Sequence, residues 1–92
     1  MAAAEITETL VGGLGSEIKT TGTALKLGVY TATVATQNDW VIFGNYTKVV
    51  AVYAVVTSSG VINPTTIDGT TLNKVVFTSA STGAVTCVVI GY

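Results

Sequence analysis

The fold is decided by residues 48–56, which read KVVAVYAVV. Valine and tyrosine suit a pleated strand, and the run is far shorter than the roughly 20 apolar residues that a membrane-spanning helix needs. Successive side chains of a strand point to opposite faces. We therefore expect Val49, Ala51, Tyr53 and Val55 on one face and Val50, Val52, Ala54 and Val56 on the other. Since both faces are apolar, both are expected to be covered.

The end of the chain has the same two-sided pattern. In residues 84–92, one face is expected to carry Val85, Cys87 and Val89, and the other Val88, Ile90 and Tyr92. An antiparallel strand with one face in water alternates apolar and polar residues instead. Because no segment has the pattern of a helix long enough to cover a sheet, we expect the second cover to be another subunit.

Valine and threonine continue the strand pattern outward from these two segments. The expected strands are residues 17–20, 24–36, 40–43, 46–57, 72–79 and 84–90 or 84–92. The pair Gly44-Asn45 is typical of a two-residue hairpin, so the third and fourth of these strands are expected to pair. Residues 61–71 contain the turn pair Asp68-Gly69 and are expected to form a connection. The predicted fold is all-β, a small antiparallel β-sandwich or barrel-like domain of five to six strands with an N-terminal arm.

The first fifteen residues differ from the rest. The alanines and glutamates of residues 2–10 favour a short helix, whereas the β-branched residues among them favour an extended strand, and both remain open. The glycine-rich run 12–15 then breaks any regular element. We expect residues 1–15 to form the arm and residues 16–92 to form a single β domain.

Charge is scarce in this chain. Of its 92 residues, 49% are apolar and only 10% are charged, and the net charge is -1, whereas about 25% charged residues is usual. A folded monomer of 9.4 kDa exposes roughly 5,000 Å² to water. We therefore expect neighbouring subunits to cover part of the surface. The alternative is a neutral, threonine-coated domain that stays soluble alone.

The composition argues against several classes of function. The chain has no histidine and one cysteine, which disfavours metal sites and most nucleophile–base pairs. It has no arginine and a slightly negative balance, which disfavours nucleic acid. We expect no cofactor, no metal, no catalytic residue and no membrane partner, and the chain is not expected to be an enzyme.

Three groups of residues remain as candidates for chemistry. Cys87 lies in a valine-rich strand and is expected to be a buried, inert thiol. Asp39 and Asp68 each adjoin a turn signal, where a carboxylate commonly bonds the local backbone; the catalytic alternative is an acid–base pair of the glycosidase type. Trp40 and Tyr46, with the other aromatic residues, are candidates for a sugar-binding platform, but a small sandwich needs them in its core.

Residues 39–92 resemble the small β-rich structural proteins of tailed bacteriophages, in particular capsid decoration or cement proteins. The likeness rests on DWVIFG at 39–44, the valine-rich 48–56, KVVFT at 74–78 and VVIGY at 88–92. These segments share richness in threonine and valine, few charges, short strands and an apolar ending on an aromatic residue. The resemblance implies a virion protein on the capsid surface that commonly forms trimers and extends an arm over the shell.

The expected function is that of a non-enzymatic viral structural protein that decorates and stabilises a phage capsid. Its expected partners are the major capsid protein or other virion subunits, together with copies of itself, with a trimer favoured. The residues expected to dock the arm on the capsid are Ile6, Leu10, Val11 and Leu14. Those expected at subunit interfaces are Val50, Val52 and Tyr92. The alternatives are a self-assembling filament or tail-type subunit and a carbohydrate-binding surface module.

Overall fold

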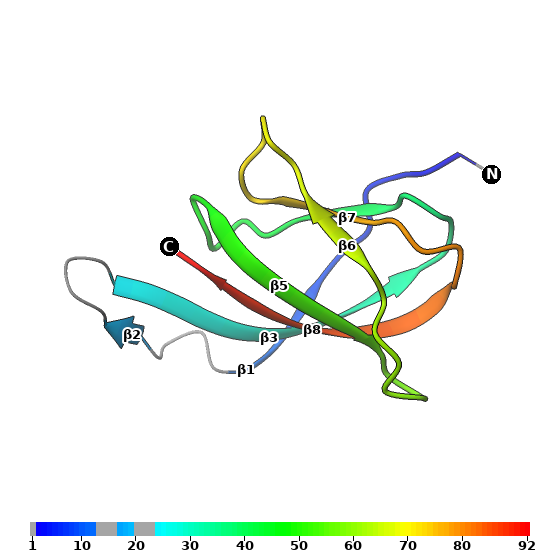
Figure 1. Cartoon of the computed structure of the whole chain (residues 1–92), viewed down its shortest axis with the longest axis horizontal. Coiled ribbons are helices and arrows are strands. Elements are labelled where there is room, and N and C mark those ends of the chain that lie inside the picture. Colours follow the sequence, from blue (N-terminus) through cyan, green and yellow to red (C-terminus); the bar gives the residue numbers. More distant parts are fainter. Residues whose placement is uncertain (1, 13–16, 20–23) are drawn as a thin grey trace.

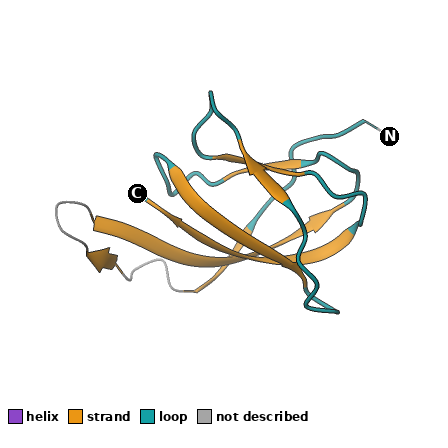
Figure 2. Ribbon diagram, in the orientation of Figure 1, coloured by secondary structure: helices purple, strands orange, loops and turns teal. Residues whose placement is uncertain are grey.

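All regular secondary structure in the described residues, 2–12, 17–19 and 24–92, of this computed structural model is β. β-Branched side chains account for this, because they pack well on a pleated surface. The strands are β1 (Thr9–Gly12), β2 (Glu17–Lys19), β3 (Ala24–Val34), β4 (Trp40–Ile42), β5 (Val49–Val56), β6 (Thr65–Ile67), β7 (Lys74–Phe77) and β8 (Gly83–Gly91). The all-β prediction is confirmed (Figure 1, Figure 2).

The strands form two antiparallel sheets. The larger sheet has the order β1-β3-β8-β5, with β2 also paired to β3, and the smaller sheet has the order β4-β7-β6. Apolar side chains from both sheets enter one buried core. The fold is therefore a β-sandwich, and the side of the larger sheet that faces away from this core is called the outer face below.

The predicted Gly44-Asn45 hairpin is wrong. β4 pairs with β7 in the smaller sheet, and β5 pairs with β8 in the larger one. Residues 43–46 do form a tight turn, in which the N–H of Tyr46 donates to the carbonyl of Phe43 at 3.0 Å. Both rings that flank the turn are buried in the core. Because these rings lie between the sheets, the turn directs the two strands into opposite layers.

The structure has two strands that the sequence did not predict. β1 lies in the segment expected to be an arm, and β6 lies in the segment expected to be a connection. β6 pairs with β7 over three residues, Thr65 to Ile67. A three-residue strand beside Pro64 shows too little alternation to be recognised, since proline and aspartate next to it read as turn signals.

A bulge in β5 changes which of its side chains face the core. The pairing with β8 shifts between Val49 and Ala51, so that Val50 has no partner position. Strict alternation had grouped Val49 with Ala51 and Tyr53, but Val49 is buried and the other two are exposed. The extra residue of a bulge moves the following side chains to the opposite face. Val49, Val52 and Ala54 therefore share the inner face.

Residues 2–12, here named the N-terminal strap, lie extended along the body (Figure 1). The N–H of Ile6 donates to the carbonyl of Trp40 at 2.8 Å, and the N–H of Trp40 donates to the carbonyl of Ala4 at 3.2 Å. Further on, Thr9–Gly12 pairs with β3. The strap thus adds to the smaller sheet at one end and to the larger sheet at the other.

Three aromatic rings occupy the centre of the core. Tyr30 meets Phe43 edge to face with ring centroids 4.9 Å apart, and Phe43 meets Tyr46 at 6.4 Å. The hydroxyl of Tyr46 donates to the carbonyl of Val89 at 3.1 Å. Such a bond satisfies the one polar group that a buried tyrosine carries.

Two glycines of the larger sheet make room for these rings. A Cβ atom at Gly28 would lie 2.8 Å from Cε1 of Tyr30 and 2.9 Å from the hydroxyl of Tyr46. A Cβ atom at Gly91 would collide with the backbone carbonyl of Lys48 and would lie 2.9 Å from Cδ2 of Tyr46. Only glycine fits at these two positions without movement of the ring or the backbone.

The Gly91→Ala change should destabilise the fold by about 3 kcal/mol, because the added methyl group meets backbone and a packed ring at once. Denaturant unfolding of the variant measures this loss. Gly44→Ala is the matched control, since nothing lies within 4 Å of a Cβ atom there, and it should change the stability by less than about 0.5 kcal/mol. Equal stability of the two variants would contradict this role of Gly91.

Candidate functional site

Asp39 connects the strap to the body. Its Oδ2 accepts the N–H groups of Ala35 at 2.9 Å and Thr36 at 2.8 Å, and its Oδ1 accepts the N–H of Ala4 at 2.9 Å. Asn38 precedes it with a φ of 71°, a left-handed conformation that asparagine tolerates. The bond from Ala4 is the largest cause of a lowered pKa at Asp39, and burial opposes it. An ionised carboxylate with three backbone donors is a structural link rather than a proton donor.

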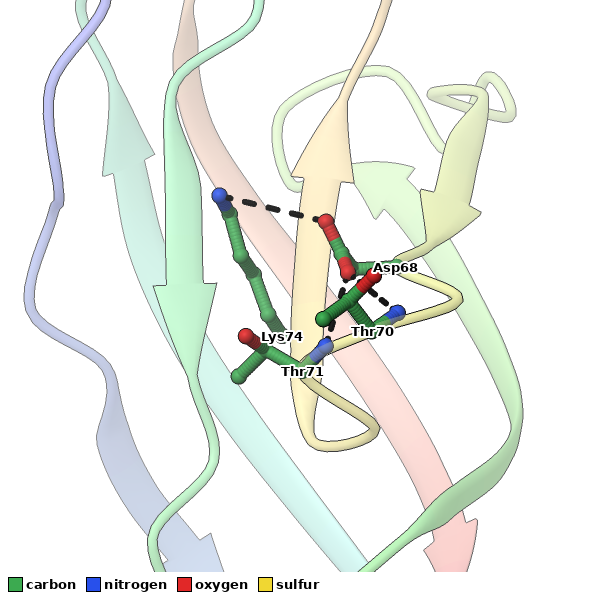
Figure 3. Close-up of polar contacts among 4 residues, drawn as sticks. All are labelled: Asp68, Thr70, Thr71 and Lys74. Atoms are coloured by element: carbon green, nitrogen blue, oxygen red, sulfur yellow. Dashed lines mark hydrogen bonds and ion pairs between the residues drawn. The ribbon is translucent and has the colours of Figure 1, made fainter.

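Asp68 orders the turn between β6 and β7. Its Oδ1 accepts the N–H groups of Thr70 at 2.7 Å and Thr71 at 2.8 Å, and its Oδ2 lies 4.0 Å from Nζ of Lys74 (Figure 3). The bonds from Thr71 and Thr70 are the largest causes of its lowered pKa. Lys74 also lies over the ring of Trp40, 4.7 Å from the centroid. Both aspartates therefore accept hydrogen bonds from nearby backbone, as expected of turn residues, and Asp39 also binds the distant N–H of Ala4.

Most of the remaining candidates for chemistry are buried in the core, whereas Trp40 is only partly buried. Cys87 is 1% exposed, and burial raises the pKa of its thiol to about 12. Such a thiol is protonated at neutral pH and is a poor nucleophile. Tyr30, Phe43 and Tyr46 are at most 3% exposed, so they form no platform for a sugar. The described residues hold no group of three or more histidine, cysteine, aspartate or glutamate side chains placed to bind a metal ion.

The docking residues expected in the arm differ in how far their side chains are exposed. Ile6 is half-buried and packs against the core, so its side chain already has a place within the chain. Leu10 and Val11 are 43% and 64% exposed. They lie in β1, at the edge of the larger sheet, where the register with β3 shifts. Leu14 lies outside the described residues.

The expected interface residues also differ in exposure. Val50 and Tyr92 are 49% and 43% exposed and lie at the same end of the larger sheet, where Tyr92 pairs with Lys48. Val52 is on the inner face and packs against the core, because the bulge at Val50 turns it inward. Val52 is therefore a poor candidate for contact with another subunit.

The outer face carries apolar side chains that the described residues leave partly or fully exposed. Residues 85, 87, 89 and 91 of β8 are buried, so the residues between them point outward. Cross-strand partners share a face. Val88 is opposite Val29 of β3 and Tyr53 of β5, and Ile90 is opposite Leu27 and Ala51. The outer patch is defined as Leu27, Val29, Ala51, Tyr53, Val55, Val88 and Ile90.

Threonine borders the outer patch at one end. Thr86 of β8 is opposite Thr31 of β3, and its hydroxyl lies 2.9 Å from that of Thr57. A groove of about 400 Å³ begins there, where the strap leaves β3. Its lining residues are Ile6, Thr7, Thr9, Thr31, Ala32, Thr33 and Ala84. None of these side chains titrates, so the groove offers hydroxyl and methyl groups but no acid–base chemistry.

The segment after β5 places apolar side chains outside and an amide inside. Val61 and Ile62 are 63% and 59% exposed, whereas Asn63 is 2% exposed. Ile62 forms a bridge with Val55, and the N–H of Asn63 donates to the carbonyl of Ala54 at 2.8 Å. The side-chain atoms Oδ1 and Nδ2 of Asn63 have no hydrogen-bond partner within the described residues. The register therefore puts Ile62 beside the outer patch and leaves a buried amide unpaired.

The predicted alternation groups Val88 with Ile90, and Ala51 with Tyr53 and Val55, as the register does, but it places Val49 on the wrong face. The bulge at Val50 and the addition of Ile62 beside Val55 both depend on pairing between distant strands. No helix among the described residues is long and apolar enough to span a membrane. The chain matches no protein-family model, and comparison with curated proteins and with solved structures finds no similar protein.

Stability should fall above pH 9 because of Cys87. The thiol has a pKa of about 12 in the folded chain against 9.0 ordinarily, so the unfolded chain loses this proton first. The resulting stabilisation is complete below pH 9 and is lost as the pH rises toward 12. The free energy of unfolding should drop by about 1 kcal/mol between pH 9 and pH 10 through this group. Urea unfolding at both pH values measures the drop, and Cys87→Ala should reduce it by that amount; an equal drop in the variant would contradict the assignment.

Proposed function

We propose that the chain is a non-enzymatic structural protein that decorates a phage capsid and stabilises it through apolar contacts between β-rich subunits. The observation that carries this proposal is the outer patch, an apolar sheet face without a charged side chain on a chain that has few charges anywhere. The resemblance to decoration proteins supplies the setting. The proposed partners are the major capsid protein or other virion subunits.

The chemistry of the described residues supports a role in binding rather than in catalysis. The two aspartates are engaged with backbone N–H groups, and the thiol is buried and protonated. What the surface offers instead is apolar area, which contributes roughly 25 cal/mol per Å² when it leaves water. Association consumes part of this gain, so one copy is expected to bind weakly. Many copies on one closed shell then reinforce one another, because each holds its neighbours in place.

The edge of β1 is the surface that we assign to the shell. Leu10 and Val11 are exposed there, and among the described residues the strand has a neighbour on one side only, where β3 lies. An edge strand of this kind presents free backbone groups to which another chain can add a strand. Leu10 and Val11 supply side-chain contacts next to that edge. The strap is thus held by Asp39 at one end while its other end presents the docking edge.

The double variant Leu10→Glu/Val11→Glu should lose binding to particles of the virus that encodes the chain. Two carboxylates in an apolar contact should weaken binding by at least about 100-fold, because each must lose its hydration. Particles stripped of the protein are mixed with each variant and pelleted, and the bound protein is quantified. Bound wild type should also raise the temperature at which the particles release their genome.

Val61→Glu is the matched control for this experiment. Val61 is as exposed as Val11, at 63%, but it lies after β5, away from β1. This variant should bind like the wild type. The proposal fails if wild-type chain does not bind the particles, and the assignment to β1 fails if the double variant binds as well as the control.

A further inference from the structure

We propose that the outer face is the site at which a second copy of this chain packs, sheet against sheet. The inference rests on the proposed function, because it names the partner of an apolar surface already assigned to subunit contacts. The resulting pair would have four layers, with the two larger sheets inside and the two smaller sheets outside. β5 and β8 would then be covered on both faces, which their two-sided apolar pattern requires.

The charge distribution favours a copy of the same chain over a different partner. The outward positions of β3, β5 and β8 within the sheet, from Leu25 to Thr33, from Ala51 to Val55 and from Ala84 to Ile90, hold no charged residue. A contact with twofold symmetry brings the same patch of both copies together. Charged patches repel themselves in such a contact unless the signs alternate. An uncharged patch meets its own copy without this cost.

The outer face has the area of a weak, reversible pair. Nine consecutive residue pairs join β3 to β8 and seven pairs join β5 to β8, whereas β1 pairs with β3 at only three positions. With strands about 4.8 Å apart and residues about 3.4 Å apart, β3, β8 and β5 together make a face of about 14 by 30 Å, or about 430 Å². Two such faces together bury about 860 Å², which is the size of a weak or transient contact.

The arrangement of side chains on the face matches that of an interface. Val88 lies at the centre, with Val29 on one side and Tyr53 on the other. Tyr53 is 54% exposed, and aromatic residues of this kind are enriched at interface centres. Thr31 and Thr86 lie at the border, where hydroxyl groups stay in contact with water. An apolar centre with a polar rim is the usual anatomy of a protein interface.

The register of Ile62 and Asn63 gives independent support. The chain exposes Ile62 beside Val55 and buries the Asn63 amide without a side-chain partner. A shift of this pairing by one residue would bury Ile62 and expose Asn63. Neither an exposed apolar side chain nor an unpaired buried amide would then remain. Local conflicts of this kind are expected where a residue serves a function beyond folding. Contact with a second copy would cover Ile62 as part of the same apolar surface.

The proposal is tested by the mass of the chain in solution. At high micromolar concentration, light scattering after size exclusion should give twice the chain mass of 9.4 kDa. The double variant Tyr53→Lys/Val88→Lys should give the monomer mass, with a dissociation constant raised at least about 100-fold by the buried ammonium groups. Val61→Lys is the control and should stay paired, because Val61 lies outside the patch.

The outcomes separate the inference from the proposed function. A wild-type monomer, a trimer, or a double variant that keeps the wild-type mass would each overturn the face-to-face pair. The trimer that the resemblance implies cannot be built from such pairs alone. If the double variant does not fold by circular dichroism, the single change Tyr53→Lys replaces it, since that side chain is already half in water. A monomer that still binds particles would sink only this inference, whereas a pair that binds no particle would sink only the proposed function.

Discussion

Tyr46 lies between the two sheets, with its ring against Gly28 and Gly91 and its hydroxyl bonded to the carbonyl of Val89. It closes the turn at residues 43–46 that carries the chain from the smaller sheet to the larger one. The side chain of Asn73 donates to the carbonyl of Tyr46 at 3.1 Å, which ties the same turn to the β6–β7 connection. The packing of the larger sheet against this turn therefore centres on this side chain. Burial also raises the pKa of its hydroxyl, so the group stays protonated and can keep donating.

Placing the large rings inside determines what is left for the surface. With Tyr30, Phe43, Tyr46 and Phe77 in the core, the outer patch is built of aliphatic side chains and the one ring of Tyr53. The chain exposes 5038 Å², close to the roughly 5,000 Å² of an ordinary monomer of this size, yet it has only 10% charged residues to spread over it. The outward positions of β3, β5 and β8 between residues 25–33, 51–55 and 84–90 hold none of these charged residues. We therefore assign subunit contacts to this face.

The sequence pattern predicts the strands that are long enough to show alternation, and it fails where pairing between distant segments decides. β3, β5 and β8 follow from their runs of apolar and β-branched residues, and Cys87 and the two aspartates could be assigned to their structural roles from local context. The sequence pattern could not predict which sheet the chain enters after Gly44-Asn45, because a turn signal does not specify whether the next strand joins the same sheet or the other one. The inward position of Val52 results from a bulge that only the partner strand reveals. The exposure of Ile62 has no local signal at all, since it depends on a bridge to Val55.

The central claim is that the outer face is covered in the working unit. Methyl NMR with a soluble paramagnetic agent tests it most directly, because the agent broadens only those signals that it can approach. In a concentrated sample, the methyl signals of Val29, Val88 and Ile90 should stay sharp while that of Val61 broadens strongly. On dilution the three protected signals should broaden as the pairs separate. Strong broadening of Val29, Val88 and Ile90 at every concentration would show that water reaches the face and would contradict the account.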